Sequence, residues 1–112
     1  MVNIDQPERR DMRPIFIDSS AWIALYKPND AHHERARKIF RGQITEDIPL
    51  ITSNVVLYEV LTVLAMRAGK NIALAFGDWF YNKAIKRGFV RCIFVDEAIE
   101  SKSWLVFQKV KK

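Results

Sequence analysis

The residues best suited to chemistry in this chain are two carboxylates, Asp18 and Glu59. Asp18 follows the apolar run Ile15-Phe16-Ile17, and the hydroxyl of Ser20 comes two residues later. Carboxylate oxygens are hard ligands that suit Mg²⁺ or Mn²⁺ better than Zn²⁺. A hydrated divalent ion held by two acids polarises a phosphodiester and generates a hydroxide nucleophile. The pair therefore predicts metal-assisted hydrolysis, with Ser20 or Asn54 as an auxiliary polar group.

Each acid also has an ordinary structural interpretation. Asp18 can end a strand and cap the next helix, because Asp side chains accept backbone N–H bonds at helix starts. The helical neighbours of Glu59 are largely apolar: Val55, Val56, Thr62 and Val63. We therefore expect Glu59 to project from a packed face. A carboxylate there needs a basic partner, protonation through a raised pKa, or a bound cation, and the residues alone leave all three open.

Apolar runs and helix signals predict the elements that position these acids. Strands are predicted over 15–17, 50–52 and 89–95, the first of them buried on both faces. Helices are predicted over 21–26, 30–41 with Gly42 as its stop, 55–68 behind a Ser53 or Asn54 cap, 71–87, and from 96 onward. This order predicts an α/β fold, a three-layer α/β/α arrangement with a small parallel sheet. Because parallel strands present their carboxyl ends at one edge, Asp18 and Glu59 are expected to converge there.

The charge balance points to a polyanionic partner. The chain carries a formal net charge of +5, and basic residues dominate its second half: Arg67, Lys70, Lys83, Lys86, Arg87 and Arg91. Such an excess favours RNA as a partner, although a basic surface that serves only solubility is the alternative. The lone cysteine, Cys92, allows no intrachain disulfide and suits a reducing cytoplasm. No apolar stretch is long enough for a membrane span, so we expect a soluble, cytoplasmic protein.

Three other groups invite a functional interpretation that their spacing does not favour. His32-His33-Glu34 resembles a metal motif, but adjacent helical residues point in different directions, so solvated histidines are expected. The aromatic run Trp79-Phe80-Tyr81 is more typical of a core or subunit interface than of a base-stacking platform. Asp96 follows the third strand and is explained by helix capping.

Two segments of the sequence resemble the PIN domain family, particularly its VapC-like toxins. The first runs from Ile15 to Leu25 and continues into Asp30 to Ala36, and the second is Thr52-Ser53-Asn54-Val55-Val56-Leu57-Tyr58-Glu59. The resemblance implies a ribonuclease that depends on Mg²⁺ or Mn²⁺, usually a homodimer and often paired with an antitoxin protein. It places the first family acid at Asp18, the second at Glu59, and an auxiliary group at Ser20.

The resemblance also implies a domain boundary and an incomplete site. Residues 1–14 are expected to form a flexible lead-in, and residues 15–112 a single PIN-like domain. The family continues into another acid-bearing helix, a further strand and further metal-site acids, so this chain resembles a C-terminally shortened member. A degenerate, non-catalytic RNA- or antitoxin-binding module is the alternative function. A third is an interaction protein that associates through exposed apolar surface.

Overall fold

Residues 13–109 are described by the computed structural model of the protein. The strands are β1 (Ile15–Phe16), β2 (Leu50–Ser53) and β3 (Val90–Ile93). The helices are α2 (Ser19–Tyr26), α3 (His33–Thr45), α4 (Asn54–Arg67), α5 (Lys70–Trp79), the π-helical turn η1 (Phe80–Ala84), and α6 (Glu97–Lys109). The predicted lead-in over 1–14 lies outside the described residues except for its last two positions.

The three strands form one parallel sheet in the order β1-β2-β3. In its register Ile15 pairs with Leu50, and Leu50 pairs with Val90. The predicted α/β fold with a small parallel sheet is confirmed. The expectation that the first strand is buried on both faces is wrong, since the side chains of Ile15 and Phe16 are 38% and 54% exposed. The reason is that β1 lies at the edge of the described sheet.

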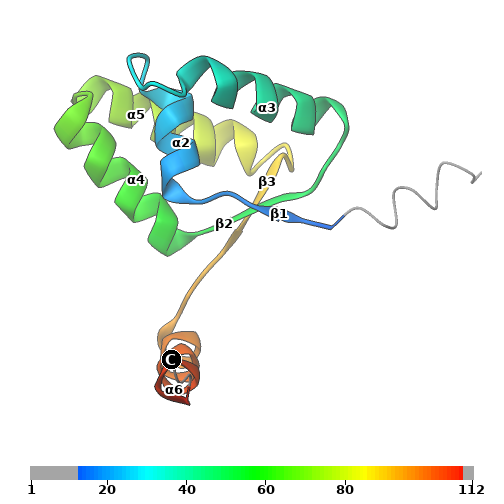
Figure 1. Ribbon diagram of the computed structural model, residues 1–112, viewed down its shortest axis with the longest axis vertical. Coiled ribbons are helices and arrows are strands. Elements are labelled where there is room, and N and C mark those ends of the chain that lie inside the picture. Colours follow the sequence, from blue (N-terminus) through cyan, green and yellow to red (C-terminus); the bar gives the residue numbers. More distant parts are fainter. Residues whose placement is uncertain (1–12, 110–112) are drawn as a thin grey trace, which may run out of the picture.

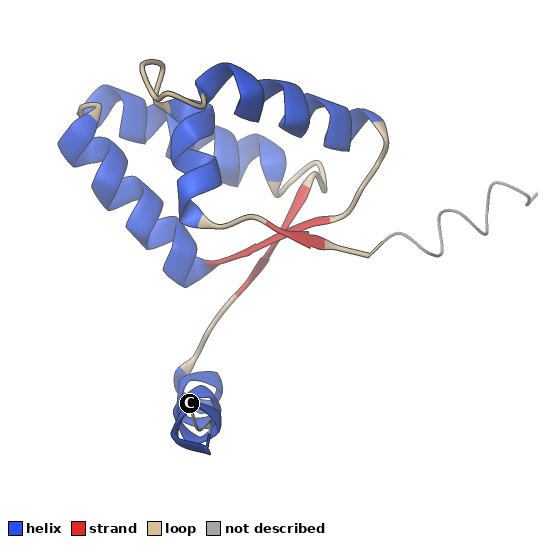
Figure 2. Ribbon diagram, viewed as in Figure 1, coloured by secondary structure: helices blue, strands red, loops and turns tan. Residues whose placement is uncertain are grey.

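The two faces of this sheet differ. On the packed face, Leu50, Thr52 and Val90 are buried beneath the helices, and helices α2 to α5 gather on one side of the strands (Figure 1). Figure 2 shows the strands lying below that group of helices. The opposite face, called here the second face, carries the side chains that alternate with the buried ones: Phe16, Ile51, Arg91 and Ile93.

An aromatic cluster fills the packed side. The ring of Trp22, which is 1% exposed, lies 5.8 to 6.1 Å from four other rings, measured between centroids. Those rings belong to Phe40, Phe76, Trp79 and Phe80. The prediction that the 79–81 run serves a core is thus confirmed for its first two residues. Tyr81, in contrast, is 45% exposed.

Helix boundaries follow the predicted signals only in part. Ser53 caps α4 as predicted, with its hydroxyl oxygen accepting a bond from the Val56 N–H at 3.2 Å. Gly42 does not stop α3, which continues to Thr45. The chain turns instead at Asp47, whose φ of 60° is left-handed. The helix predicted to run to Arg87 changes to π geometry at Phe80, which lets Phe80 and Ala84 both reach the core.

The last helix, α6, stands apart from the body of the molecule. It lies at the end of an extended segment that leaves β3 (Figure 1), and it is absent from the closely packed element pairs of residues 13–109. Its start is capped as predicted, because the Ile99 N–H donates to Asp96 Oδ1 at 3.0 Å. Apolar side chains on α6 are therefore largely in solvent, among them Ile99, Leu105 and Val106.

Candidate active site

Asp18 stands at the carboxyl end of β1 and caps α2. Its Oδ1 accepts a hydrogen bond from the Ser19 N–H at 2.8 Å, and its backbone carbonyl accepts from the N–H groups of Ala21 and Trp22. The capping interpretation is therefore correct for one carboxylate oxygen. The side chain is nevertheless exposed, and within the described part of the chain Oδ2 accepts no hydrogen bond. Asp18 is thus held in place through Oδ1, while Oδ2 has no hydrogen-bond partner among residues 13–109.

A buried chain of hydrogen bonds fixes the backbone that precedes Asp18. The Trp22 Nε1–H donates to Thr52 Oγ1 at 3.2 Å, and the Thr52 hydroxyl donates to the Ile17 carbonyl at 3.0 Å. The Ile17 N–H in turn donates to the Ile51 carbonyl at 2.8 Å. Thr52 is fully buried, so both bonds are shielded from water. These hydrogen bonds join α2, β2 and the end of β1 directly beside Asp18.

Glu59 lies on the solvent side of α4, and the expectation that it projects from a packed face is wrong. The side chains of α4 that are buried are Val56, Leu57, Val60 and Leu64. Glu59 itself is exposed, and it shares the exposed side of α4 with Val55 at 55%, Tyr58 at 58% and Met66 at 80%. Of the apolar neighbours seen in the sequence, Val56 is buried and Val63 is half-buried, whereas Val55 is left exposed by the described elements. Burial therefore does not single out Glu59 as a functional residue, and its candidacy depends on its position in the fold.

The elements that carry the two acids are neighbours. β1 and β2 are adjacent parallel strands, and α2 and α4, which follow them, pack against each other. Asp18 begins α2, and Glu59 lies in the second turn of α4. Both carboxylates are exposed to solvent. That they bind one ion stays a prediction.

The two proposed auxiliary groups have different surroundings. The Asn54 amide clamps the chain beyond β3: its Oδ1 accepts from the Val95 N–H at 2.8 Å, and its Nδ2 donates to the Val95 carbonyl at 3.5 Å. Asn54 is therefore committed to structure. Ser20 is exposed and lines a groove beside Asp18. Of the two, only Ser20 remains available to a ligand.

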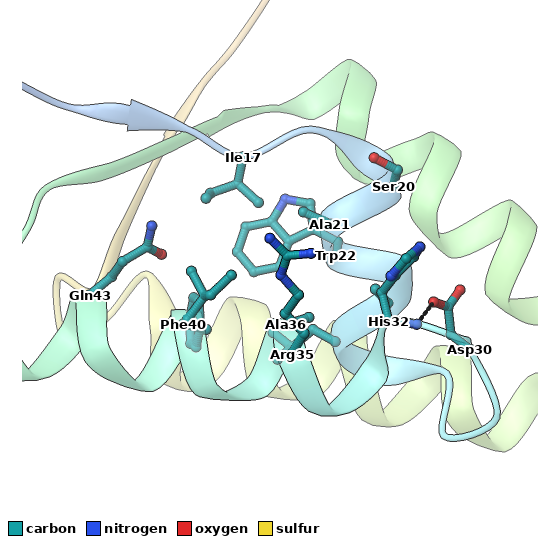
Figure 3. A pocket seen from close by; sticks show the side chains of 13 residues that line it. Ile17, Ser20, Ala21, Trp22, Asp30, His32, Arg35, Ala36, Phe40 and Gln43 are labelled. Carbon is teal, nitrogen blue, oxygen red and sulfur yellow. Dashed lines mark hydrogen bonds between the residues drawn. The ribbon is translucent and has the colours of Figure 1, made fainter.

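The groove runs between α2 and α3 and has a volume of about 470 Å³. Trp22, Ala36 and Phe40 lie among the side chains of its apolar floor (Figure 3). Polar side chains also line it: Ser20, Asp30, His32, Arg35 and Gln43. Arg35 and Gln43 could not be assigned to this groove from the sequence, because their placement depends on how α3 lies against α2. Ile39 of α3 also lines the groove and is 50% exposed.

The side chains of His32 and His33 have different surroundings. His33 is half-buried, and its Nδ1–H donates to the Ala24 carbonyl at 2.8 Å, which joins the start of α3 to α2. The expectation of a solvated histidine therefore fails for His33 and holds for the exposed His32. Within residues 13–109 no group of three or more His, Cys, Asp and Glu side chains is arranged to hold a metal ion.

The basic residues that were expected to bind a polyanion lie at the surface. All six basic residues singled out in the second half of the chain are exposed. They are therefore accessible to a polyanion. Cys92 is half-buried in β3, and burial raises the pKa of its thiol. None of the described helices has the length and apolar character needed to cross a membrane.

Comparison with known proteins settles the family. The PIN domain family model matches residues 15–101. The chain belongs to the PIN domain family. Over 92 residues it is 32% identical to the 23S rRNA-specific endonuclease VapC20 of two Mycobacterium tuberculosis strains, CDC 1551 / Oshkosh and H37Rv. That match covers 82% of this chain and 66% of the relative, so the chain spans about two thirds of the length of these curated relatives.

A solved structure extends the likeness to three dimensions. The crystal structure of Mycobacterium tuberculosis VapC20, described as a sarcin-ricin loop cleaving toxin, matches with a TM-score of 0.70 at 28% identity. The match covers 85% of this chain and 67% of that one. The predicted resemblance to the PIN family and its VapC-like members is confirmed, and with it the PIN fold.

Proposed function

We propose that this chain acts in the cytoplasm as a PIN-type, divalent-metal-dependent endoribonuclease, the toxin of a toxin–antitoxin pair. The observation that carries the proposal is the placement of Asp18. One of its oxygens is fixed by the cap of α2, the other is open to solvent, and a buried hydrogen-bond chain holds its backbone. Two relatives named as 23S rRNA-specific endonucleases match 92 residues of the chain, and the segment matched by the PIN domain model, residues 15–101, contains both acids.

The donor set fits Mg²⁺ or Mn²⁺. Mg²⁺ keeps several waters and is bound through one or two carboxylates together with substrate phosphates. Asp18 and Glu59 offer two exposed carboxylates that a hydrated ion can reach. When bound, such an ion polarises a phosphodiester and lowers the pKa of its water. Ser20 would orient the substrate from the end of the groove, and the exposed basic residues would hold backbone phosphates.

The direct test is cleavage of an RNA that contains a sarcin-ricin loop, in the presence of Mg²⁺ or Mn²⁺. Asp18→Asn removes the charge but keeps a side chain that caps helices well, so the fold is retained. We expect the rate to fall at least about 100-fold, as for loss of a group that acts in the transition state. Glu59→Gln should act in the same direction. Glu34→Gln, an exposed acid on α3, is the matched control and should cleave normally.

Unchanged cleavage by Asp18→Asn, with an unchanged circular dichroism spectrum, would contradict the assignment of Asp18. Cleavage that persists in excess EDTA would contradict the requirement for a metal. The EDTA assay uses the unsubstituted protein. It therefore distinguishes an error in the choice of Asp18 from an error in the proposed metal-dependent reaction.

One observation favours a non-catalytic binding module as a second candidate. Two acids are a small set, and the described residues hold no cluster of three metal-binding side chains. On this second proposal, Asp18 and Glu59 form an incomplete acidic site. This candidate predicts RNA binding that weakens steeply with salt and no turnover at any metal concentration. Fluorescence anisotropy with labelled RNA, run beside the cleavage assay, distinguishes the two.

The protein partners are a second copy and an antitoxin. The exposed apolar side chains of α4, Val55, Tyr58 and Met66, offer a surface for a homodimer beside Glu59. Met66→Lys should shift a dimer toward monomer in sedimentation experiments. The groove between α2 and α3 has an apolar floor and polar groups along its sides, which suits an apolar segment of an antitoxin.

A further inference from the structure

The groove between α2 and α3 lies directly beside the candidate active site. Ser20, which lines it, comes two residues after Asp18 in the sequence (Figure 3). The inference drawn from this groove rests on the proposed function, in which a phosphodiester of RNA is cleaved at Asp18. The strand on either side of that bond has to continue over the neighbouring surface of the protein. The groove is a path that such a strand can follow.

Arg35 gives this groove its cation. The α3 residues that line the groove follow helical spacing, so they share one face of the helix: Arg35, Ala36, Ile39, Phe40 and Gln43. Among the described residues that line the groove, Arg35 is the one Arg or Lys. Its side chain extends from α3 into the groove, toward α2 (Figure 3). A polyanion that lies in the groove therefore meets this guanidinium.

The guanidinium of Arg35 is available to a ligand, whereas the carboxylate of the groove is already engaged. Arg35 is exposed, and within residues 13–109 it forms no ion pair or hydrogen bond through its side chain. Asp30, the acid among the described lining residues, is half-buried, and its Oδ1 accepts from the His32 N–H at 2.8 Å. That bond holds the turn before α3. The planar fork of an Arg side chain matches two oxygens of a phosphate.

We propose that Arg35 binds a backbone phosphate of the RNA, at a linkage other than the one cleaved at Asp18. Contacts to phosphates fix the register of a strand on a protein without reading its sequence. Arg35 would thus decide which linkage of a bound strand reaches Asp18. Ile39, which is 50% exposed one turn further along α3, offers apolar surface to the sugar or base of the same nucleotide.

The salt dependence of RNA binding tests this contact. The full chain, without an antitoxin, is titrated into a labelled RNA hairpin that contains a sarcin-ricin loop, in EDTA and at several salt concentrations. Each phosphate contact contributes about 0.7 to 0.9 to the slope of log K against log salt. Arg35→Gln should lower the magnitude of the slope by that amount and weaken binding about fivefold.

Two further variants separate a phosphate contact from a general loss of charge. Arg37→Gln removes the same charge from the same helix, but Arg37 lines a different hollow, so it is the matched control. We expect it to keep the slope and to change affinity less than about twofold. Arg35→Lys keeps the charge and loses the fork, so it should restore the slope and only part of the affinity.

Modified RNAs locate the phosphate. Each carries one methylphosphonate, which replaces a charged oxygen by a methyl group, with the adjacent 2′-hydroxyl methylated to keep the linkage intact. The matched control RNAs carry only the 2′-O-methyl group. At one linkage the methylphosphonate should weaken binding to the unsubstituted chain about fivefold and leave binding to Arg35→Gln unchanged.

Equal slopes and affinities for Arg35→Gln and the unsubstituted chain, with equal circular dichroism spectra, would overturn the proposal. The groove would then be left to an apolar protein segment. So would methylphosphonate effects that are the same in both proteins at every linkage. If the unsubstituted chain binds no RNA, the proposed function fails together with the role of Arg35. If it binds RNA and only the Arg35 effect is missing, the role of Arg35 alone is wrong.

Discussion

The two faces of the sheet are built from alternate residues of the same strands, yet one face is buried and the other is partly exposed. Leu50 and Val90 are each 2% exposed on the packed face, whereas Phe16 and Ile93 on the second face are about half exposed. The packed face fixes the backbone of Asp18 through Trp22 and Thr52. The second face contributes nothing to that geometry. The comparison teaches that the geometry of the candidate site depends on the packed side of the sheet.

The largest expected difference comes from the same substitution on the two sides. Phe80 is fully buried in the aromatic cluster, so Phe80→Ala should lower the free energy of unfolding by about 3–5 kcal/mol. Phe16→Ala should cost less than about 1 kcal/mol, because half of that ring is already in solvent. Urea unfolding at low protein concentration measures both. Equal losses would show that the second face is packed as well as the first.

A smaller loss is expected from the buried hydroxyl that joins the site to the sheet. Thr52→Val leaves the Trp22 Nε1–H and the Ile17 carbonyl without their partner inside the protein. A buried polar group left unsatisfied costs about 1–3 kcal/mol, so unfolding should become easier by about that amount. Thr62 is exposed on α4, and its hydroxyl donates to the Tyr58 carbonyl one turn earlier. Thr62→Val should therefore change stability by at most about 0.5 kcal/mol. A larger loss of stability for Thr62→Val than for Thr52→Val would contradict the expected difference between buried and exposed hydroxyl groups.

The helix cap behind the site should have a still smaller effect. The Ser53 hydroxyl accepts the Val56 N–H and begins α4, the helix that carries Glu59. Ser53→Ala should therefore cost about 1 kcal/mol of unfolding free energy. Ser101→Ala, on exposed α6, should be close to neutral. Thermal or urea unfolding checks both, and a neutral Ser53→Ala would show that packing alone holds the start of α4.

Alkaline pH should weaken the packed side through Tyr26. Burial, aided by the nearby Asp78 charge, raises the pKa of Tyr26 from 10.0 to about 12. The unfolded chain therefore loses this proton first, so the stability is complete below about pH 10 and declines as the pH rises toward 12. Urea unfolding should give a lower free energy at pH 11 than at pH 9. Tyr26→Phe should reduce this fall, and an identical pH dependence in the variant would contradict the assignment.

The parallel sheet and the position of Asp18 were predictable because their causes are local. An apolar run before an acid and a helix signal after it predicts a strand that ends at Asp18, and the Ser53 cap is a similar short-range signal. The environment of Glu59 was not predictable. Its neighbours Val55 and Thr62 have the spacing of a packed face, but which side of α4 is covered depends on where α2 and α5 lie.

The same limit explains the groove and the second face. Arg35 and Gln43 acquire a common site only when α3 packs against α2, and no local spacing records that contact. Phe16 was expected to be buried because apolar runs are typical of central strands. Its exposure follows from the strand order, which puts β1 at the edge of the described sheet. Tertiary neighbours, and not propensity, decided these positions.

The distribution of tryptophans gives each region its own optical reporter. Trp22 and Trp79 lie 6.1 Å apart, between ring centroids, in the aromatic cluster, whereas Trp104 is 58% exposed on α6. Quenching by acrylamide should reach the α6 indole well before the clustered pair. With Trp104→Phe as the reference, intrinsic fluorescence can follow the surroundings of α6 and the folding of the body separately in the same sample.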